Sequence, residues 1–275
     1  MNISIFLKEN KGGYKEVVRT AKGVGVNRVQ LFAGYDFPLD ATPNEIKEIK
    51  NFFDDNGILI TAACTDLGKG MFYENDVGFY ETEKRAMNIA KELGANVFTT
   101  EIGVIPEVKN SIQYENLRAA CETLGAYSES IGGCLAIRTG SEKASILKAF
   151  LKDISCKGLG VSFHPAGFTM SGTDEPVSAL FELKDFIRLV CATDGIQVEN
   201  FDPKAYYAPR YYAQNFCGWQ VMEHKPLGEG NVDLMGYFDA LSKIDYTGDI
   251  VVEHDLKNGT LQKEVEYVQR RIKGE

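Results

Sequence analysis

The chain has 275 residues, of which 44% are hydrophobic and 25% are charged, and its formal net charge is −9. This length is enough to bury one large core, which predicts a single domain over residues 1–275. The acidic balance argues against nucleic acid and anionic membranes as partners, because both attract cationic surfaces. The six cysteines include no C-x-x-C pair, and no apolar run approaches the ~20 residues that a membrane span needs. We therefore expect a soluble, cytoplasmic protein with reduced thiols.

Short apolar runs of β character alternate along the chain with segments of helical period. The predicted strands are Ile3–Phe6, Arg28–Phe32, Ile58–Ala63, Asn96–Thr100, Cys134–Arg138, Gly160–His164, Leu189–Thr193 and Asp249–Glu253. The predicted helices are Tyr14–Gly23, Pro43–Asp55, Phe79–Leu93, Tyr114–Ile131, Ser141–Asp153, Pro176–Ile187 and Leu234–Lys243. Eight strands alternating with helices predict a (β/α)₈ TIM barrel, in which functional side chains lie at the carboxyl ends of the strands.

One stretch, residues 199–226, interrupts this alternation between the seventh and eighth strands. It contains aromatic residues without a sustained period: Tyr206, Tyr207, Tyr211, Tyr212, Phe216 and Trp219. We predict a long loop over the top of the barrel. In one interpretation it is a lid whose aromatics, Trp219 among them, stack on a ligand, or a contact within a homo-oligomer. In the other it packs its own aromatic side chains together.

The most specific motif is near the end of the chain. Leu227-Gly-Glu-Gly230 is followed by Val232-Asp233, an amphipathic helix, Tyr246-Thr-Gly248 and Val251-Val-Glu253. This order resembles the run into the eighth strand of the sugar phosphate isomerase/epimerase superfamily, the xylose isomerase-like barrels that include relatives of endonuclease IV. The resemblance covers nearly the whole chain. It implies a protein of carbohydrate metabolism whose partner is a small sugar or sugar phosphate.

The resemblance also implies a divalent cation held by a Glu, an Asp, a His and a Glu at the ends of strands five to eight. Only the last of these, Glu253, is present here. Arg138 stands in the place of the first Glu, His164 in the place of the Asp and Cys191 in the place of the His. Asp194, three residues after Cys191, matches the pattern. The metal site is therefore predicted to be degenerate.

Charge balance favours a site that holds no metal. Arg138 and Glu253 cancel, and His164 and Cys191 carry no charge in their neutral forms. An arginine and a divalent cation a few ångströms apart repel by about 8 kcal/mol at an effective dielectric constant of about 20. We therefore predict that no cofactor is bound. The alternative is a divalent metal such as zinc held by His164, Cys191 and Glu253, since three protein ligands plus water are typical of catalytic zinc.

Two functions are compatible with these residues. An aldose–ketose isomerase or epimerase would use Glu253 as the base, Arg138 to polarise a carbonyl group and His164 as the acid. In a catalytically inactive sugar-binding or regulatory barrel, Arg138 and Glu253 would form only a salt bridge. Further ligand contacts are predicted at Glu101, Cys191, Asp194, His224 and Trp219.

Overall fold

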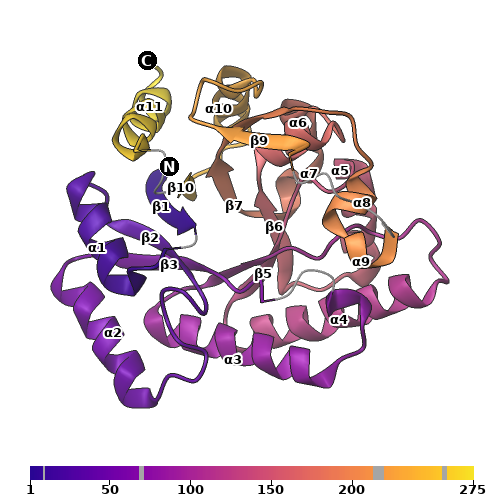
Figure 1. Cartoon of the computed structure of the whole chain (residues 1–275), viewed down its shortest axis with the longest axis horizontal. Coiled ribbons are helices and arrows are strands. Elements are labelled where there is room, and N and C mark those ends of the chain that lie inside the picture. Colours follow the sequence, from indigo (N-terminus) through magenta and orange to yellow (C-terminus); the bar gives the residue numbers. More distant parts are fainter. Residues whose placement is uncertain (9, 68–70, 213–219, 256–258) are drawn as a thin grey trace.

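The computed structural model describes residues 1–8, 10–67, 71–212, 220–255 and 259–275. Within them, eight parallel strands close into a barrel in the order β1-β10-β7-β6-β5-β4-β3-β2 (Figure 1). These strands are β1 (Asn2–Lys8), β2 (Arg28–Phe32), β3 (Leu59–Cys64), β4 (Val97–Thr100), β5 (Cys134–Arg138), β6 (Leu159–Phe163), β7 (Ile187–Ala192) and β10 (Asp249–Asp255). All eight predicted strands are present, and the predicted fold, a single (β/α)₈ TIM barrel, is confirmed.

Helices surround the barrel and cover its outer face (Figure 1). They are α1 (Gly13–Gly23), α2 (Pro43–Asp55), α3 (Val77–Leu93), α4 (Ile112–Ser130), α5 (Ala144–Ile154), α6 (Pro165–Ser171), α7 (Pro176–Leu183), α10 (Leu234–Lys243) and α11 (Leu261–Lys273), with short 3₁₀ turns at Met71–Tyr73 and Lys184–Phe186. Two of these helices were not predicted. Almost every residue of α6 is buried, so it has no amphipathic pattern; α11 has one, with Leu261, Val265 and Val268 on its buried face. None of the described helices is long and apolar enough to cross a membrane.

Alternation along the strands decides which side chains enter the barrel lumen. On β10, Val252 packs in the main core between strands and helices, whereas Val251 belongs to a separate cluster inside the barrel. The buried members of that lumen cluster are Phe6, Ala62, Leu189, Cys191 and Val251. Glu253 continues the lumen side of β10. His254 points outward, and its Nδ1 lies 2.7 Å from a carboxylate oxygen of Glu264 on α11.

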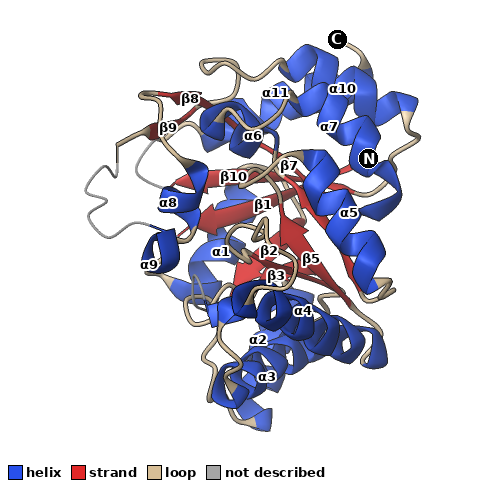
Figure 2. Cartoon of the chain, turned by 90° about the vertical axis from the view of Figure 1, so that its right-hand side faces the viewer, coloured by secondary structure: helices blue, strands red, loops and turns tan. Residues whose placement is uncertain are grey.

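The stretch between β7 and β10 is more regular than predicted. Strands β8 (Asp194–Gln197) and β9 (Met222–Lys225) pair antiparallel, and α8 (Pro203–Tyr207) and α9 (Pro209–Tyr212) lie between them. The predicted long loop at residues 199–226 therefore contains two short helices and a strand in its described part; Phe216 and Trp219 lie outside the described residues. Figure 2 shows α8 and α9 at the end of the barrel toward which β1 and β10 point, the carboxyl end.

Candidate functional site

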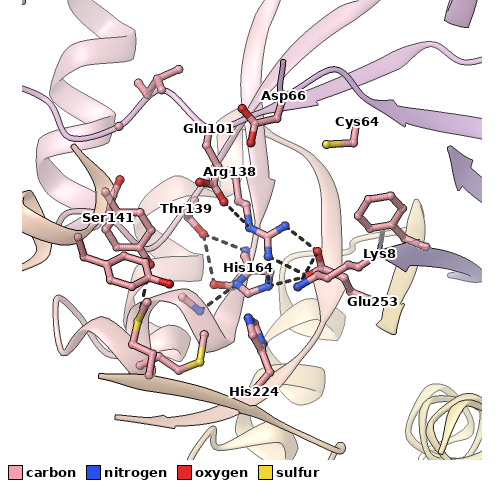
Figure 3. Close-up of a pocket in the computed structure, with 18 of the residues that line it drawn as sticks. Lys8, Cys64, Asp66, Glu101, Arg138, Thr139, Ser141, His164, His224 and Glu253 are labelled. Atoms are coloured by element: carbon pink, nitrogen blue, oxygen red, sulfur yellow. Dashed lines mark hydrogen bonds and ion pairs between the residues drawn. The ribbon is translucent and has the colours of Figure 1, made fainter. Parts of the chain in front are cut away.

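A cavity of about 760 Å³ opens at the carboxyl end of the barrel. Side chains from the ends of the barrel strands line it, together with residues of α8 and β9. Its polar lining residues include Lys8, Asp66, Glu101, Arg138, His164, His224 and Glu253, which Figure 3 shows around one centre. The three residues predicted to be catalytic, Arg138, His164 and Glu253, lie in mutual contact.

Arg138 and Glu253 form a two-pronged ion pair. Nη1 of Arg138 lies 2.7 Å from Oε1 of Glu253, and Nη2 lies 2.8 Å from Oε2. Nζ of Lys8 approaches the same Oε1 at 3.2 Å, and the Glu253 side chain is only 1% exposed. Burial alone would raise the pKa of Glu253, but the charges of Arg138 and Lys8 outweigh it and hold that pKa well below its usual range. Glu253 is therefore an ionised carboxylate with both oxygens engaged.

His164 is fixed in one neutral form by its neighbours. It caps the start of α6, and its Nδ1 accepts the backbone N–H of Gly167 at 2.9 Å. The proton of the neutral ring is therefore on Nε2, which donates to Oε2 of Glu253 at 2.8 Å. Nη2 of Arg138 lies 2.6 Å from the same nitrogen, and this approach is a contact and not a hydrogen bond, because both groups are donors. Burial and the nearby charge of Arg138 lower the pKa of His164 to about 4. At neutral pH His164 is a hydrogen-bond donor without charge.

Two glycines allow the ends of β5 and β6 to approach closely. Gly140 has a φ of 121°, and a Cβ there would lie 2.6 Å from the backbone of Gly167. A Cβ on Gly167 would lie 2.6 Å from the carbonyl oxygen of Thr139. Oγ1 of Thr139 in turn accepts the backbone N–H of His164 at 2.9 Å. This backbone packing brings His164 against Arg138.

Two of the predicted ligand contacts, Glu101 and His224, line the cavity. The Glu101 side chain is 24% exposed, and its Oε1 lies 3.6 Å from Nε of Arg138. The ring of His224, on β9, meets the ring of His164 edge to face at a centroid distance of 5.9 Å. Both side chains are therefore placed where a ligand in the cavity would reach them.

Cys191 lies inside the barrel and does not line this cavity. It borders a separate void of about 30 Å³, together with Arg138 and Glu253. Its Sγ lies 4.0 Å from Oγ of Ser162. Burial raises the pKa of Cys191 to about 12, so the side chain is an uncharged thiol at neutral pH.

Asp194 was predicted to contact a ligand, but it does not line the cavity. It is buried, and its carboxylate accepts backbone N–H groups of Gly195 at 2.8 Å and of Gly228, Gly230 and Val232 at 3.0 Å each. Four backbone donors satisfy this carboxylate, and it is not part of the cavity lining. Asp194 thus ties the Leu-Gly-Glu-Gly segment to the start of β8. Trp219, another predicted contact, lies outside the described residues.

Three further residues line the cavity that were not predicted individually from the sequence: Lys8, Tyr206 and Tyr207. A signal for Lys8 was available: it follows Phe6 by two positions on β1, so strand alternation sends both side chains into the lumen. Tyr206 and Tyr207 belong to the aromatic stretch, which was interpreted only as a whole.

The donor atoms of the site do not match those a divalent cation needs. Arg138 occupies both oxygens of Glu253, and Nδ1 of His164 is bonded to the backbone. In the part of the chain that the structure describes, no three His, Cys, Asp or Glu side chains are grouped so that they could hold a metal ion. The alternative zinc ligands His164, Cys191 and Glu253 are therefore not assembled as a ligand set.

Comparison with known families identifies the chain. The model of the family described as xylose isomerase-like TIM barrel matches residues 18–271. The chain belongs to this family. A search of curated proteins gave no match.

Solved structures of xylose isomerase-like barrels resemble this one over almost the whole chain. A xylose isomerase domain protein from Planctomyces limnophilus has a TM-score of 0.78 at 22% identity, covering 99% of this chain and 96% of its own. D-psicose 3-epimerase from Clostridium cellulolyticum H10, solved with D-tagatose, has a TM-score of 0.72 at 13% identity, covering 99% of each chain. A xylose isomerase-like barrel from Mycobacterium smegmatis, solved in complex with magnesium, has a TM-score of 0.71 at 14% identity, covering 98% and 95%. At sequence identities this low, the similarity shows a shared fold.

Proposed function

We propose that this xylose isomerase-like barrel binds a small sugar or sugar derivative in the cavity above Arg138 and Glu253, and that it does so without a divalent metal ion. The two-pronged contact between Arg138 and Glu253 carries the proposal, because it provides the buried carboxylate with a permanent positive charge. In this proposal the pair is the fixed floor of a binding site.

The same contact argues against Glu253 as the base of an isomerisation. A general base must reach the proton that it removes, and it works best with a pKa near the working pH. The Glu253 side chain is 1% exposed, its two oxygens are bonded to Arg138, and its pKa is held well below the usual range. Releasing it from Arg138 would leave a buried carboxylate without its main partner, which is costly.

The character of the cavity supports a sugar-like ligand. Such a ligand needs hydrogen-bond donors and acceptors for its hydroxyl groups and apolar faces for its carbon skeleton. Glu101 and His224 offer polar groups, while Phe32, Tyr206 and Tyr207 offer aromatic surface. Family membership points the same way, since the fold neighbours include D-psicose 3-epimerase solved with D-tagatose.

A second candidate is an aldose–ketose isomerase or epimerase in which Glu101 replaces Glu253 as the base. The observation that favours it is the exposure of Glu101 to the cavity, at 24%, beside Arg138, which is 23% exposed. Glu101 would remove a proton next to a carbonyl group, and Arg138 would stabilise the negative charge that develops on the oxygen.

Calorimetric titration with a panel of aldoses, ketoses and their derivatives, in buffer containing EDTA, tests the proposal. The bound ketoses are then incubated in D₂O and followed by NMR. Binding without deuterium incorporation at carbon supports the first candidate. Incorporation that Glu101→Gln abolishes supports the second, and incorporation that only Glu253→Gln abolishes would restore Glu253 as the base. Glu182→Gln, on the outer helix α7, is the matched control, and failure of every sugar and sugar derivative to bind would overturn both candidates.

A further inference from the structure

Charged side chains are unevenly distributed around the cavity. Figure 3 shows Asp66 and Glu101 on one side of Arg138, and Lys8 and His224 on another. The acidic pair follows β3 and β4, whereas Lys8 ends β1 and His224 belongs to β9. A ligand that fills the cavity therefore meets an acidic side and a basic side.

Lys8 adds a positive charge that Glu253 alone does not balance. Arg138 already holds both oxygens of Glu253, at 2.7 and 2.8 Å, so Lys8 is a second cation on one carboxylate, at 3.2 Å. The Lys8 side chain is 29% exposed, and it lines the cavity. Lys8, Arg138 and Glu253 together carry one positive charge in excess. Glu101, whose Oε1 lies 3.6 Å from Nε of Arg138, offsets that charge on the acidic side of the cavity, so the positive end of the arrangement is at Lys8.

His224 adds hydrogen-bonding capacity at the same place. Its ring lies exposed in the cavity next to His164, and among the described residues neither ring nitrogen has a hydrogen-bond partner. Burial by surrounding atoms and the charge of Lys8 lower the pKa of His224, so the ring is neutral at neutral pH and presents one N–H.

A second lysine, Lys11, follows Lys8 by three positions in the chain. It lies in the turn between β1 and α1 and also lines the cavity. The turn is held in place by Asn10, whose side-chain amide donates to the carbonyl of Gly13 at 2.8 Å and to Asp36 at 2.9 Å. Two lysines close in the chain and a neutral imidazole thus line the cavity.

We infer that the corner formed by Lys8, Lys11 and His224 binds an anionic group, so that the ligand is a sugar carrying a carboxylate or a phosphate and not a neutral sugar. This inference rests on the proposed function and specifies its substrate class. The anionic group lies against Lys8, on the basic side of the cavity, and the sugar hydroxyls face Asp66 and Glu101. A carboxylate pairs with the single charge of Lys8, and a phosphate dianion also requires Lys11.

The experiment compares matched ligands by calorimetric titration: D-glucose, D-galactose and D-mannose, each with its uronate and its 6-phosphate. We expect at least one anionic member to bind about tenfold more tightly than its neutral parent, as one charge-assisted hydrogen bond provides. The difference should shrink as salt is added, because the corner is open to solvent. Preference for the uronate or for the phosphate identifies the source of the negative charge.

Substitutions test whether Lys8 and Lys11 cause the preference for the anionic ligand. Lys8→Gln should remove the preference for the anionic ligand, and Lys8→Arg should restore it. Lys22→Gln is the control, since Nζ of Lys22 bonds Asn56 on the outside of the barrel at 3.0 Å. Thermal unfolding shows whether each variant is folded, and Lys11→Gln, at an exposed position, gives a second test should Lys8→Gln not fold.

Three results would overturn the inference. Neutral sugars that bind as tightly as their anionic derivatives would refute it and leave the proposed function intact. A preference for anions that survives both Lys8→Gln and Lys11→Gln would place the anionic group elsewhere. Failure of all ligands, neutral and anionic, would refute the proposed function and the inference with it.

Discussion

Arg138 and Glu253, 115 positions apart in the chain, are joined by two N–O contacts of 2.7 and 2.8 Å at the carboxyl end of the barrel. The contact links β5 to β10 across the intervening strands β6 and β7. It supplies from within the protein the positive charge that a buried carboxylate requires. We expect both stability and ligand binding to depend on it.

Arg138→Met should destabilise the protein by about 3–5 kcal/mol, because it leaves Glu253 buried with only Lys8 and His164 as partners. Urea denaturation measures the change in the free energy of unfolding. The double variant Arg138→Met/Glu253→Met should recover most of the loss, since no buried charge remains. Lys148→Met, which removes the partner of the partly exposed Glu182, is the control and should cost less than about 1 kcal/mol. An equally small loss in Arg138→Met would contradict the importance of the pair.

His164 should make the protein sensitive to acid. Its pKa is about 4 in the folded state against an ordinary value of 6.5, so the unfolded chain binds the proton more readily between these values. The stabilisation is complete above about pH 6.5 and is lost as the pH falls toward about 4, with a magnitude on the order of 3 kcal/mol. Unfolding free energies of the parent and of His164→Gln, measured across this range, should converge toward the acid end. Parallel curves of unfolding free energy against pH would show that His164 is not responsible for the acid sensitivity.

Glu142 should make the protein less stable as the pH rises, the opposite of the acid sensitivity expected from His164. It is buried beside the cavity, where its carboxyl group accepts the N–H of Ile105 at 3.2 Å and the hydroxyl of Ser141 at 3.1 Å. Burial raises its pKa from 4.5 to about 7, so its contribution to stability is present below 4.5 and declines as the pH rises through about 7. Glu142→Gln keeps the acceptor and cannot ionise, so it should be more stable than the parent by about 1–3 kcal/mol at about pH 8. In acid the two proteins should have nearly equal free energies of unfolding. A difference that stays constant at all pH values would refute this explanation.

Asp194→Asn should destabilise the protein by about 2–4 kcal/mol, because one amide oxygen cannot accept all the N–H groups that the carboxylate accepts. The same change should weaken ligand binding, since Asp194 begins the hairpin that carries His224. Asp239→Asn, on the exposed face of α10, provides the control and should leave both quantities unchanged. Normal ligand affinity in a destabilised Asp194→Asn would show that the hairpin position does not depend on this residue.

The barrel could be predicted from sequence because each strand carries its own local pattern, and the ends of β5, β6 and β10 placed Arg138, His164 and Glu253 near one another. Lys8 was missed because the first strand was predicted to end at Phe6, whereas β1 continues to Lys8 and alternation then sends its side chain into the lumen. The role of Asp194 was not accessible, because three of its four donors come from a segment 34 to 38 positions later. Nor could the sequence tell whether Arg138 would bind Glu253 or point toward a ligand, since that depends on side-chain conformation. His224 was placed by an antiparallel pair within a stretch predicted to be irregular.

The most direct test of the account is the affinity of the tightest-binding sugar derivative, measured by titration of the chelator-treated protein and repeated with added Mg²⁺, Mn²⁺ or Zn²⁺. We predict one ligand per chain and the same affinity in every case, because Arg138 already provides the positive charge beside Glu253. Binding that requires one of these ions, or that strengthens by more than about tenfold in its presence, would contradict the central claim.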